Sequence, residues 1–150
     1  MLSYFNIKMI NIFNNESLSK DEVLKMMVSN MNENTDLIND KDTFLKEILE
    51  REKAGSTGIG VGVAIPHART DSVKEVVVSL GLLTTPVDFD SIDGEKVRIV
   101  VLVGAPKEKS KKYLEFLSTL SRIFRNKKIR DSIIESTSKE GLIEAIARIV

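Results

Sequence analysis

The sequence predicts an α/β fold in which a mixed β-sheet lies between layers of helices. The middle of the 150-residue chain holds two nearly continuous apolar runs, VVVSLGLL (76–83) and VRIVVLV (97–103). Their β-branched residues are typical of strands buried on both faces. The regions before and after them show apolar residues at helical spacing. Central strands between flanking helices favour an α/β sandwich, and the length suits one domain with a single core.

The first half of the chain is expected to contain a short strand and two helices. Residues 10–13 are the strand candidate. Ser19 and Glu22 have the spacing of a capping box, which marks the start of the first helix. A second helix is predicted to begin near Asp40 and to end before Gly55, because glycine commonly terminates helices.

The second half is expected to contain the two long strands and three helices. Residues 61–65 add a short strand candidate, and residues 87–94 form a loop that ends in an Asp-Gly turn. Helices are predicted over 110–124, over 129–134 and after the cap residue Ser138. The prolines at positions 66, 86 and 106 each lie near the end of an apolar run, which is typical of strand ends.

Composition narrows the classes of function. Acidic and basic residues number 22 each, so neither a nucleic-acid partner nor a general affinity for anionic membranes is indicated. No apolar run approaches the roughly 20 residues that span a bilayer. The N-terminal segment lacks the pattern of a secretory signal peptide. The chain has no cysteine, which excludes disulfides and thiolate metal sites. We therefore expect a cytoplasmic protein without direct membrane insertion.

The segment GSTGIGVGVAIPHART, residues 55–70, holds the strongest candidate for function. Its glycine-dense loop leads to His67, the only histidine in the chain. The glycine spacing fits neither a dinucleotide fingerprint nor a Walker A loop. With one histidine and no cysteine, no metal and no cofactor are expected. A Ser-His-Asp hydrolase stays open, since such residues meet in space, although no G-x-S-x-G elbow supports it.

The remaining candidate function is that His67 carries a phosphoryl group. An imidazole pKa near ~6.5 leaves a neutral nucleophilic nitrogen at cellular pH. Glycines permit close backbone approach and offer amide donors to an anion. The neighbouring residues supply cations and hydroxyls for the phosphoryl oxygens, namely Arg51, Lys53, Arg69, Ser56 and Thr57. An ordinary hydrogen-bonded surface histidine beside a solvated basic face stays open on these residues alone.

Residues 51–68, REKAGSTGIGVGVAIPHA, closely resemble the signature of the IIA domain of the bacterial phosphotransferase system, of the fructose/mannitol type. The likeness continues in DFDSIDGEKVRIVVLVGAP and YLEFLSTLSRIF. It leaves residues 1–9 as an N-terminal extension of a single domain over 1–150. The resemblance implies the mannitol-type IIA fold, an α/β sandwich with a mixed, mostly parallel five-stranded sheet flanked by helices.

The resemblance also implies a role for each motif residue. His67 takes a phosphoryl group on Nε2 from phospho-HPr and passes it to a IIB partner, which phosphorylates sugar during uptake. Arg51 stabilises the phosphoryl group, and Ser56, Thr57 and Gly58 lie beside the histidine. In this branch IIB generally accepts on a cysteine, and the chain has neither a cysteine nor a membrane span. We therefore expect IIB and the membrane IIC permease to be separate chains.

One position departs from the family pattern. Many members have a second histidine at the start of the late helix, where this chain has Tyr113. A tyrosine donates a hydrogen bond to a phosphate but carries no positive charge near neutral pH. Tyr113 therefore either supports the phosphoryl group or only packs the end of the helix.

Two functions fit the resemblance. The first is a transport phosphocarrier for fructose or a related sugar or polyol. The second is a nitrogen-regulatory IIA protein, which shares the His67 motif and binds other proteins according to its phosphorylation state. We take the transport role as the first hypothesis.

Overall fold

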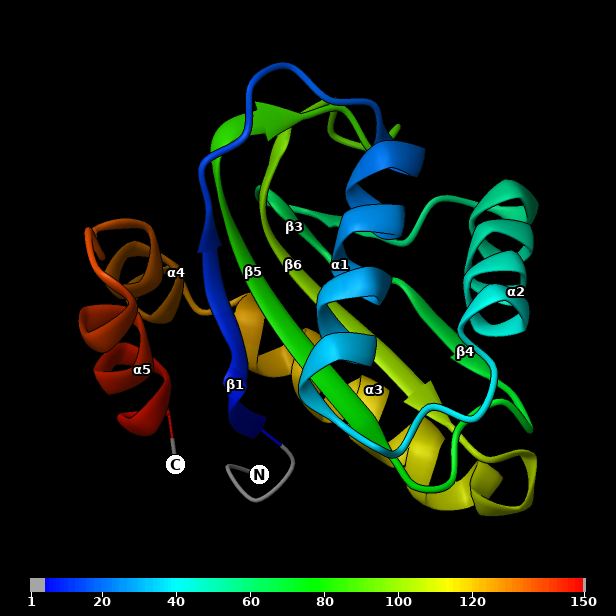
Figure 1. Ribbon diagram of the computed structural model, residues 1–150. Helices are drawn as coiled ribbons and strands as arrows, with labels where there is room; N and C mark the ends of the chain where they lie inside the picture. The colour runs from blue at the N-terminus through cyan, green and yellow to red at the C-terminus, as the bar shows by residue number, and fades with distance from the viewer. Residues whose placement is uncertain (1–4, 150) are drawn as a thin grey trace.

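The computed structural model describes residues 5–149, which form one β-sheet between two layers of helices (Figure 1). The α/β sandwich expected from the sequence is therefore confirmed. In chain order the elements are β1 (Phe5–Phe13), α1 (Lys20–Asn34), α2 (Lys41–Ala54), β2 (Gly58–Gly60), β3 (Val63–Ala64), β4 (His67–Arg69), β5 (Val77–Val87), β6 (Val97–Ala105), the 3-10 helix η2 (Lys107–Lys109), α3 (Ser110–Phe124), α4 (Lys127–Ile134) and α5 (Lys139–Ala147).

The sheet is mixed and, within the described residues, has six strands that occupy five positions across it. Its order is β1-β5-β6-β3-β2, and β4 also pairs with β6. Strands β3 and β4 follow one another along β6, where β3 pairs with residues 99–100 and β4 with residues 103–105. The pairs β1–β5, β3–β6 and β4–β6 are parallel, whereas β2–β3 and β5–β6 are antiparallel. This arrangement agrees with the mostly parallel sheet that the resemblance implied.

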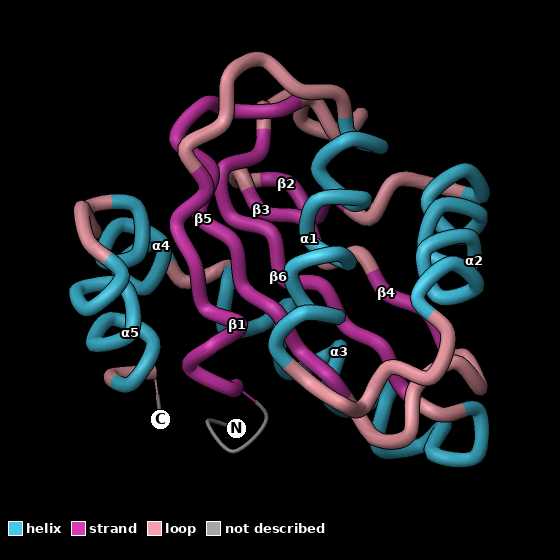
Figure 2. The backbone as a smooth tube through the Cα atoms, in the orientation of Figure 1, coloured by secondary structure: helices cyan, strands magenta, loops and turns pink. Residues whose placement is uncertain are grey.

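The two helical layers cover opposite faces of the sheet. Because side chains alternate along a strand, β6 contributes to both cores. Val100 and Leu102 pack with α1 and α2, whereas Ile99, Val101 and Val103 pack with α3, α4 and α5. Figure 2 shows α1 crossing in front of the strands and α3 behind them. The continuous apolar runs of the sequence are thus explained by burial on both faces.

The predicted helix starts are confirmed where polar side chains cap them. Ser19 accepts a hydrogen bond from the backbone N–H of Glu22, whose carboxylate accepts from the Ser19 N–H, which completes the capping box of α1. Asp40 caps α2, and Ser138 caps α5. Each cap contributes about 1 kcal/mol to stability, because it satisfies an N–H that has no partner inside the helix.

The first strand is longer than the sequence predicted. We expected it over residues 10–13, yet β1 begins at Phe5. Residues 5–9 of the expected N-terminal extension are therefore part of the sheet, while residues 1–4 lie outside the described residues. The error arose because Asn6 and Lys8 are polar and Ile7 is 60% exposed, so this part of the strand has no buried alternating pattern.

The strand expected over residues 61–65 is a small hairpin instead. Strands β2 and β3 are antiparallel, and the turn between them contains Val61 and Gly62 at φ 56° and 79°. Val61 adopts this left-handed conformation while its N–H donates to a carboxylate oxygen of Asp93 at 2.8 Å. Val61 is apolar and β-branched, so its side chain favours a strand and gives no sign of a turn.

No helix among residues 5–149 combines the length and the apolar character that a bilayer crossing requires.

Candidate functional site

His67 begins β4 and points toward the layer of α3. Strand β4 is held parallel to β6, where His67 lies opposite Val103. Along the segment, Ile65 belongs to the core on the α3 side, and Ala64 and Ala68 belong to the core on the α1 and α2 side. His67 follows the alternation of Ile65, and its half-buried side chain lines a cleft at the surface.

A backbone hydrogen bond determines which nitrogen of His67 carries the proton and which carries the lone pair. Nδ1 lies 2.7 Å from the carbonyl oxygen of Ile65. A carbonyl oxygen only accepts hydrogen bonds, so Nδ1 carries the proton and the lone pair of the neutral ring is on Nε2. The segment is fixed, because the carbonyl of the intervening Pro66 accepts from the Val103 N–H at 2.9 Å.

The surroundings hold the imidazole in its neutral form. Burial lowers the pKa of His67 below its usual value of 6.5, and the positive charge of Arg51 lowers it further. The hydrogen bond to Ile65 and the negative charge of Glu52 act in the opposite direction but do not reverse the shift. At neutral pH, Nε2 is therefore available to attack an electrophile.

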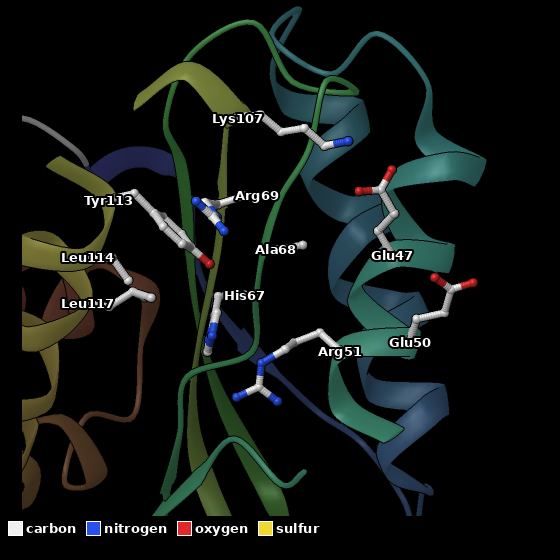
Figure 3. Close-up of a pocket in the computed structure, with 10 residues that line it drawn as sticks. All are labelled: Glu47, Glu50, Arg51, His67, Ala68, Arg69, Lys107, Tyr113, Leu114 and Leu117. Atoms are coloured by element: carbon white, nitrogen blue, oxygen red, sulfur yellow. The ribbon is translucent and has the colours of Figure 1, made fainter. Parts of the chain in front are cut away.

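The main cleft beside His67 has a volume of about 690 Å³ and opens between α2 and α3 (Figure 3). Arg51 reaches it from the last turn of α2, where its Nη1 donates to the Gly55 carbonyl at 2.8 Å. The cleft contains cationic, anionic and apolar side chains. It is lined by Glu47, Glu50, Arg51, His67, Ala68, Arg69, Lys107, Tyr113, Leu114 and Leu117.

A smaller hollow of about 180 Å³ adjoins the cleft and contains the loop residues predicted from the sequence. Ser56, Thr57 and Gly58 line it together with Arg51 and His67. The structure therefore brings the five motif residues to one place. Lys53 is exposed and lines neither cavity among the described residues, so only two of the three cations noted in the sequence lie at the site.

The two hydroxyls of this loop bind protein groups rather than facing an open ligand position. The Ser56 hydroxyl donates to the carbonyl of Phe89 and accepts from the Gly58 N–H at 3.0 Å. The Thr57 hydroxyl donates to the carboxylate of Glu52. In this structure both side chains therefore hold the loop in shape beside His67.

Glu52 is a residue of the site to which the sequence analysis gave no role. It is only 4% exposed, and its carboxylate accepts from the Thr57 N–H at 3.0 Å and forms an ion pair with Lys20 at 3.4 Å. A signal was present in the sequence. Glu52 follows Phe44 and Ile48 at four-residue spacing, so it lies on the buried face of α2, where a carboxylate needs partners.

Gly58 lies very close to Ser91. A Cβ at this position would lie 2.1 Å from the Ser91 hydroxyl oxygen, so the Ser91 side chain or the loop would have to shift. The loop of residues 88–94 therefore packs directly on the glycine-rich segment, and Ser91 is itself 8% exposed. Gly58 brings these two loops together behind the hollow next to His67.

Tyr113 packs into the core and also lines the cleft. It is 3% exposed and belongs to the core on the α3 side, so it packs the start of the helix. Its ring also lies 6.0 Å from the His67 ring, at 59° to it, and its hydroxyl extends toward the cleft (Figure 3). Burial raises the pKa of Tyr113 to about 12, so the phenol is a neutral hydrogen-bond donor at every physiological pH.

Further residues of the cleft were also missed from the sequence. Glu47 and Glu50 precede Arg51 on α2, Lys107 lies in η2, and Leu117 faces the cleft from α3. Their positions depend on how α2 and α3 pack around the sheet, which no local pattern shows. Within residues 5–149, no group of three or more histidines and carboxylates has the arrangement of a metal site.

Comparison with known proteins decides the family. Residues 3–149 match the family described as "Phosphoenolpyruvate-dependent sugar phosphotransferase system, EIIA 2". The chain belongs to this family. The resemblance that residues 51–68 suggested is therefore confirmed over nearly the whole chain.

The curated relatives of this EIIA chain include proteins of fructose systems. It is 36% identical over 133 residues to the fructose-specific EIIABC component of Bacillus subtilis, a match that covers 89% of this chain and 21% of that protein. It is 32% identical over 113 residues to the fructose-specific EIIA component of Haloferax volcanii, which covers 75% of this chain and 73% of that protein. The chain thus spans only a fifth of the Bacillus protein's length.

Solved structures of a nitrogen-regulatory IIA protein and of a mannitol IIA enzyme both share this fold. The nitrogen regulatory protein IIA-Ntr of Neisseria meningitidis superposes with a TM-score of 0.86 at 30% identity, covering 99% of this chain and 97% of that one. The mannitol IIA enzyme of Escherichia coli, solved with phosphorylated IIB, gives a TM-score of 0.78 at 16% identity, with coverages of 96% and 97%. The second likeness concerns the fold alone.

Proposed function

We propose that the protein is the IIA component of a phosphoenolpyruvate-dependent sugar phosphotransferase system. His67 accepts a phosphoryl group from phospho-HPr and passes it to a IIB component, which uses it for the uptake of fructose or a related sugar or polyol. One observation carries the proposal. The Ile65 carbonyl fixes the proton of His67 on Nδ1, so that Nε2 is a neutral nucleophile in a cleft that also contains Arg51.

The acceptance step follows from this geometry. The lone pair of Nε2 forms a bond to phosphorus while the N–P bond of the donor's phosphohistidine breaks, and the electrons of that bond return to the donor imidazole. Charge spreads over the phosphoryl oxygens in the transition state, so cations placed around them lower the barrier. Arg51 is the candidate for this role, because its charge already acts on the His67 ring.

The hydrogen bond to Ile65 also supports onward transfer. Once Nε2 carries the phosphoryl group, the carbonyl of Ile65 keeps favouring a proton on Nδ1. A protonated phosphoimidazole is a better leaving group than an unprotonated one, because its ring departs as a neutral imidazole. His67 therefore releases the phosphoryl group readily to the next nucleophile.

The partners and the place of action belong to the same proposal. The fructose-specific names of the two relatives above support a sugar-transport role, and the residue resemblance implies a IIB acceptor. The residue resemblance implies phospho-HPr as donor and a membrane IIC permease beyond IIB. We place the exchange in the cytoplasm, with no cofactor and no nucleic acid involved.

A second candidate is a nitrogen-regulatory IIA protein, and the likeness to IIA-Ntr favours it. In that role the phosphoryl group on His67 adds negative charge at one surface and changes which protein binds there. The chemistry of acceptance is the same in both candidates. They differ in the fate of the phosphoryl group.

The test combines acceptance and delivery. The protein is incubated with phosphoenolpyruvate, Enzyme I and HPr, and its intact mass is measured beside that of the His67→Ala variant. A single acid-labile phosphoryl adduct, absent from the variant, is the expected result. Purified IIB is then added. Transfer to IIB supports the transport role, whereas a phosphoryl group that IIB never accepts contradicts it and leaves the regulatory role.

A further inference from the structure

Arg69 lies on the same strand and the same face as His67. The two residues begin and end β4, and alternate positions of a strand project to one side. Both line the 690 Å³ cleft, and Figure 3 shows the Arg69 guanidinium and the Tyr113 hydroxyl extending toward the same part of it. Arg51 enters the cleft from α2, so the two arginines reach the cleft from different elements.

The Arg69 side chain is held in place at the start of α3. Its Nη1 donates to the hydroxyl of Ser110 at 2.6 Å, and that hydroxyl donates to the carbonyl of Lys107 at 2.9 Å. Within residues 5–149, the bond to Ser110 is the only hydrogen bond that the Arg69 guanidinium makes. A guanidinium has five N–H donors, so donors remain for an anion in the cleft.

Arg69 acts on Tyr113, whereas Arg51 acts on both Tyr113 and His67. Burial raises the pKa of Tyr113. The positive charges of Arg69 and Arg51 oppose this rise, and Arg69 has the larger effect of the two. Both side chains line the cleft, and the charge of Arg69 acts on the phenol there. A nearby cation withdraws electron density from the O–H bond, which makes the hydroxyl a stronger donor toward an anion.

We propose that Arg69 is a second phosphoryl-binding residue, which together with the Tyr113 hydroxyl contacts the transferring group from the α3 side, opposite Arg51. The inference rests on the function proposed above. As Nε2 of His67 bonds to phosphorus and the donor N–P bond breaks, Arg69 supplies charge and Tyr113 supplies a neutral donor.

The competing explanation is that Arg69 only anchors the start of α3 through Ser110. Ser110→Ala removes the anchor and keeps the guanidinium, while Arg69→Gln removes the charge. Arg69→Lys keeps the charge but loses the planar fork. Lys53→Gln is the matched control, since it removes one positive charge from an exposed residue outside both cavities. Thermal unfolding of each variant verifies that it is folded.

The experiment measures the rate of His67 phosphorylation with two donors, phospho-HPr and the small molecule phosphoramidate. We expect Arg69→Gln to lower the rate roughly tenfold to hundredfold with both donors. With phospho-HPr the loss should lie in the maximal rate and not in the half-saturating concentration. Arg69→Lys should recover part of the rate, and Lys53→Gln should stay within about twofold of the wild type.

The outcomes separate the two proposals. Equal rates for Arg69→Gln and Lys53→Gln with phosphoramidate overturn the role of Arg69, and so does a Ser110→Ala variant that reproduces the whole loss. A wild-type protein that accepts from phosphoramidate but not from phospho-HPr contradicts the proposed function, and the phosphoramidate rates still decide the role of Arg69. A wild-type protein that accepts from neither donor overturns both.

Discussion

Glu52 influences His67 through its charge and through the loop that it holds. Its carboxylate accepts from both the backbone N–H and the hydroxyl of Thr57, and it forms an ion pair with Lys20, which also pairs with Asp90. One buried side chain therefore connects α1, α2, the glycine-rich segment and the loop of residues 88–94. Its negative charge also raises the pKa of His67 against the effect of burial.

Glu52→Gln should therefore weaken both the fold and the site. An amide offers one acceptor oxygen to the two donors of Thr57 and no charge to Lys20, so we expect a loss of about 1–3 kcal/mol in the free energy of unfolding. The pKa of His67 should fall further. Denaturant unfolding measures the first effect, and NMR titration of the only histidine measures the second. Glu33→Gln, an exposed change in α1, is the control. An unchanged His67 pKa would contradict the electrostatic role.

The pH dependence of stability follows from the lowered pKa of His67. Above the ordinary value of 6.5 the ring is neutral in the folded and unfolded states, so it has no effect. As the pH falls below 6.5, the unfolded chain takes up the proton first, and the folded state loses stability.

We therefore expect wild-type protein to lose more stability than His67→Gln between pH 7 and about pH 5. Carboxyls whose pKa is lowered by hydrogen bonds, Glu22, Asp40 and Asp93, also lose stabilisation in acid, but their effect is the same in both proteins. Denaturant unfolding at several pH values gives the comparison. Parallel curves for the two proteins would show that His67 has no lowered pKa.

Among the elements, the β2–β3 hairpin determines the shape of the hollow beside His67. Gly58→Ala places a Cβ against the Ser91 hydroxyl, so either this hydroxyl must rotate away or one of the two loops must move. We expect a loss of about 1–3 kcal/mol in stability together with slower phosphoryl acceptance. Unfolding experiments and the transfer assay with phospho-HPr measure the two effects.

A double mutant isolates this contact. The Gly58→Ala/Ser91→Ala double mutant lacks the clashing hydroxyl. The Cβ added at position 58 then lies 3.1 Å from the Cβ at position 91, so much of the lost stability should be recovered. Gly55→Ala is the control, since no atom lies within 4 Å of its Cβ position and its φ of 165° is ordinary extended backbone. If Ser91→Ala gives no recovery, the contact is not the cause of the loss.

The elements that the sequence predicted well are those whose signals are local. Helix α3 was predicted at its observed bounds, Ser110–Phe124, because its apolar positions repeat at helical spacing, and the caps Ser19 and Asp40 mark their helices directly. The β2–β3 hairpin was missed because its strands have three and two residues, and its conformation depends on contact with Asp93. Local patterns cannot reveal a turn that a distant loop stabilises.

At the scale of the whole molecule, the site depends on both helical layers. Arg51 comes from α2 on one face of the sheet and Tyr113 from α3 on the other, and His67 lies at the start of β4 between them. The motif of residues 51–67 predicted His67, Arg51 and the loop, since these residues are adjacent in sequence. Arg69 was also named from the sequence, because it lies two residues after His67 on β4. Lys107, Glu47 and Glu50 line the cleft only because the helical layers pack around it.

Gly104→Ala tests this dependence. Gly104 pairs with Ala68, next to His67, and an added Cβ would lie 2.7 Å from the ring of Phe44 in α2. The substitution should push α2 away from the sheet, cost about 1–3 kcal/mol in stability and slow acceptance, because Arg51 moves with α2. Adding Phe44→Leu should restore part of the rate. Normal acceptance by a destabilised Gly104→Ala protein would contradict the coupling between α2 packing and the site.

The position of the phosphoryl group on His67 tests the central claim most directly. The protein is phosphorylated with phosphoenolpyruvate, Enzyme I and HPr, and the modified ring nitrogen is identified by NMR with ¹⁵N-labelled histidine, which gives the signals of one residue. Because Nδ1 donates a hydrogen bond to the Ile65 carbonyl, we predict phosphorylation on Nε2 alone. Phosphorylation on Nδ1, or an unmodified His67 beside phosphorylated HPr, would contradict it.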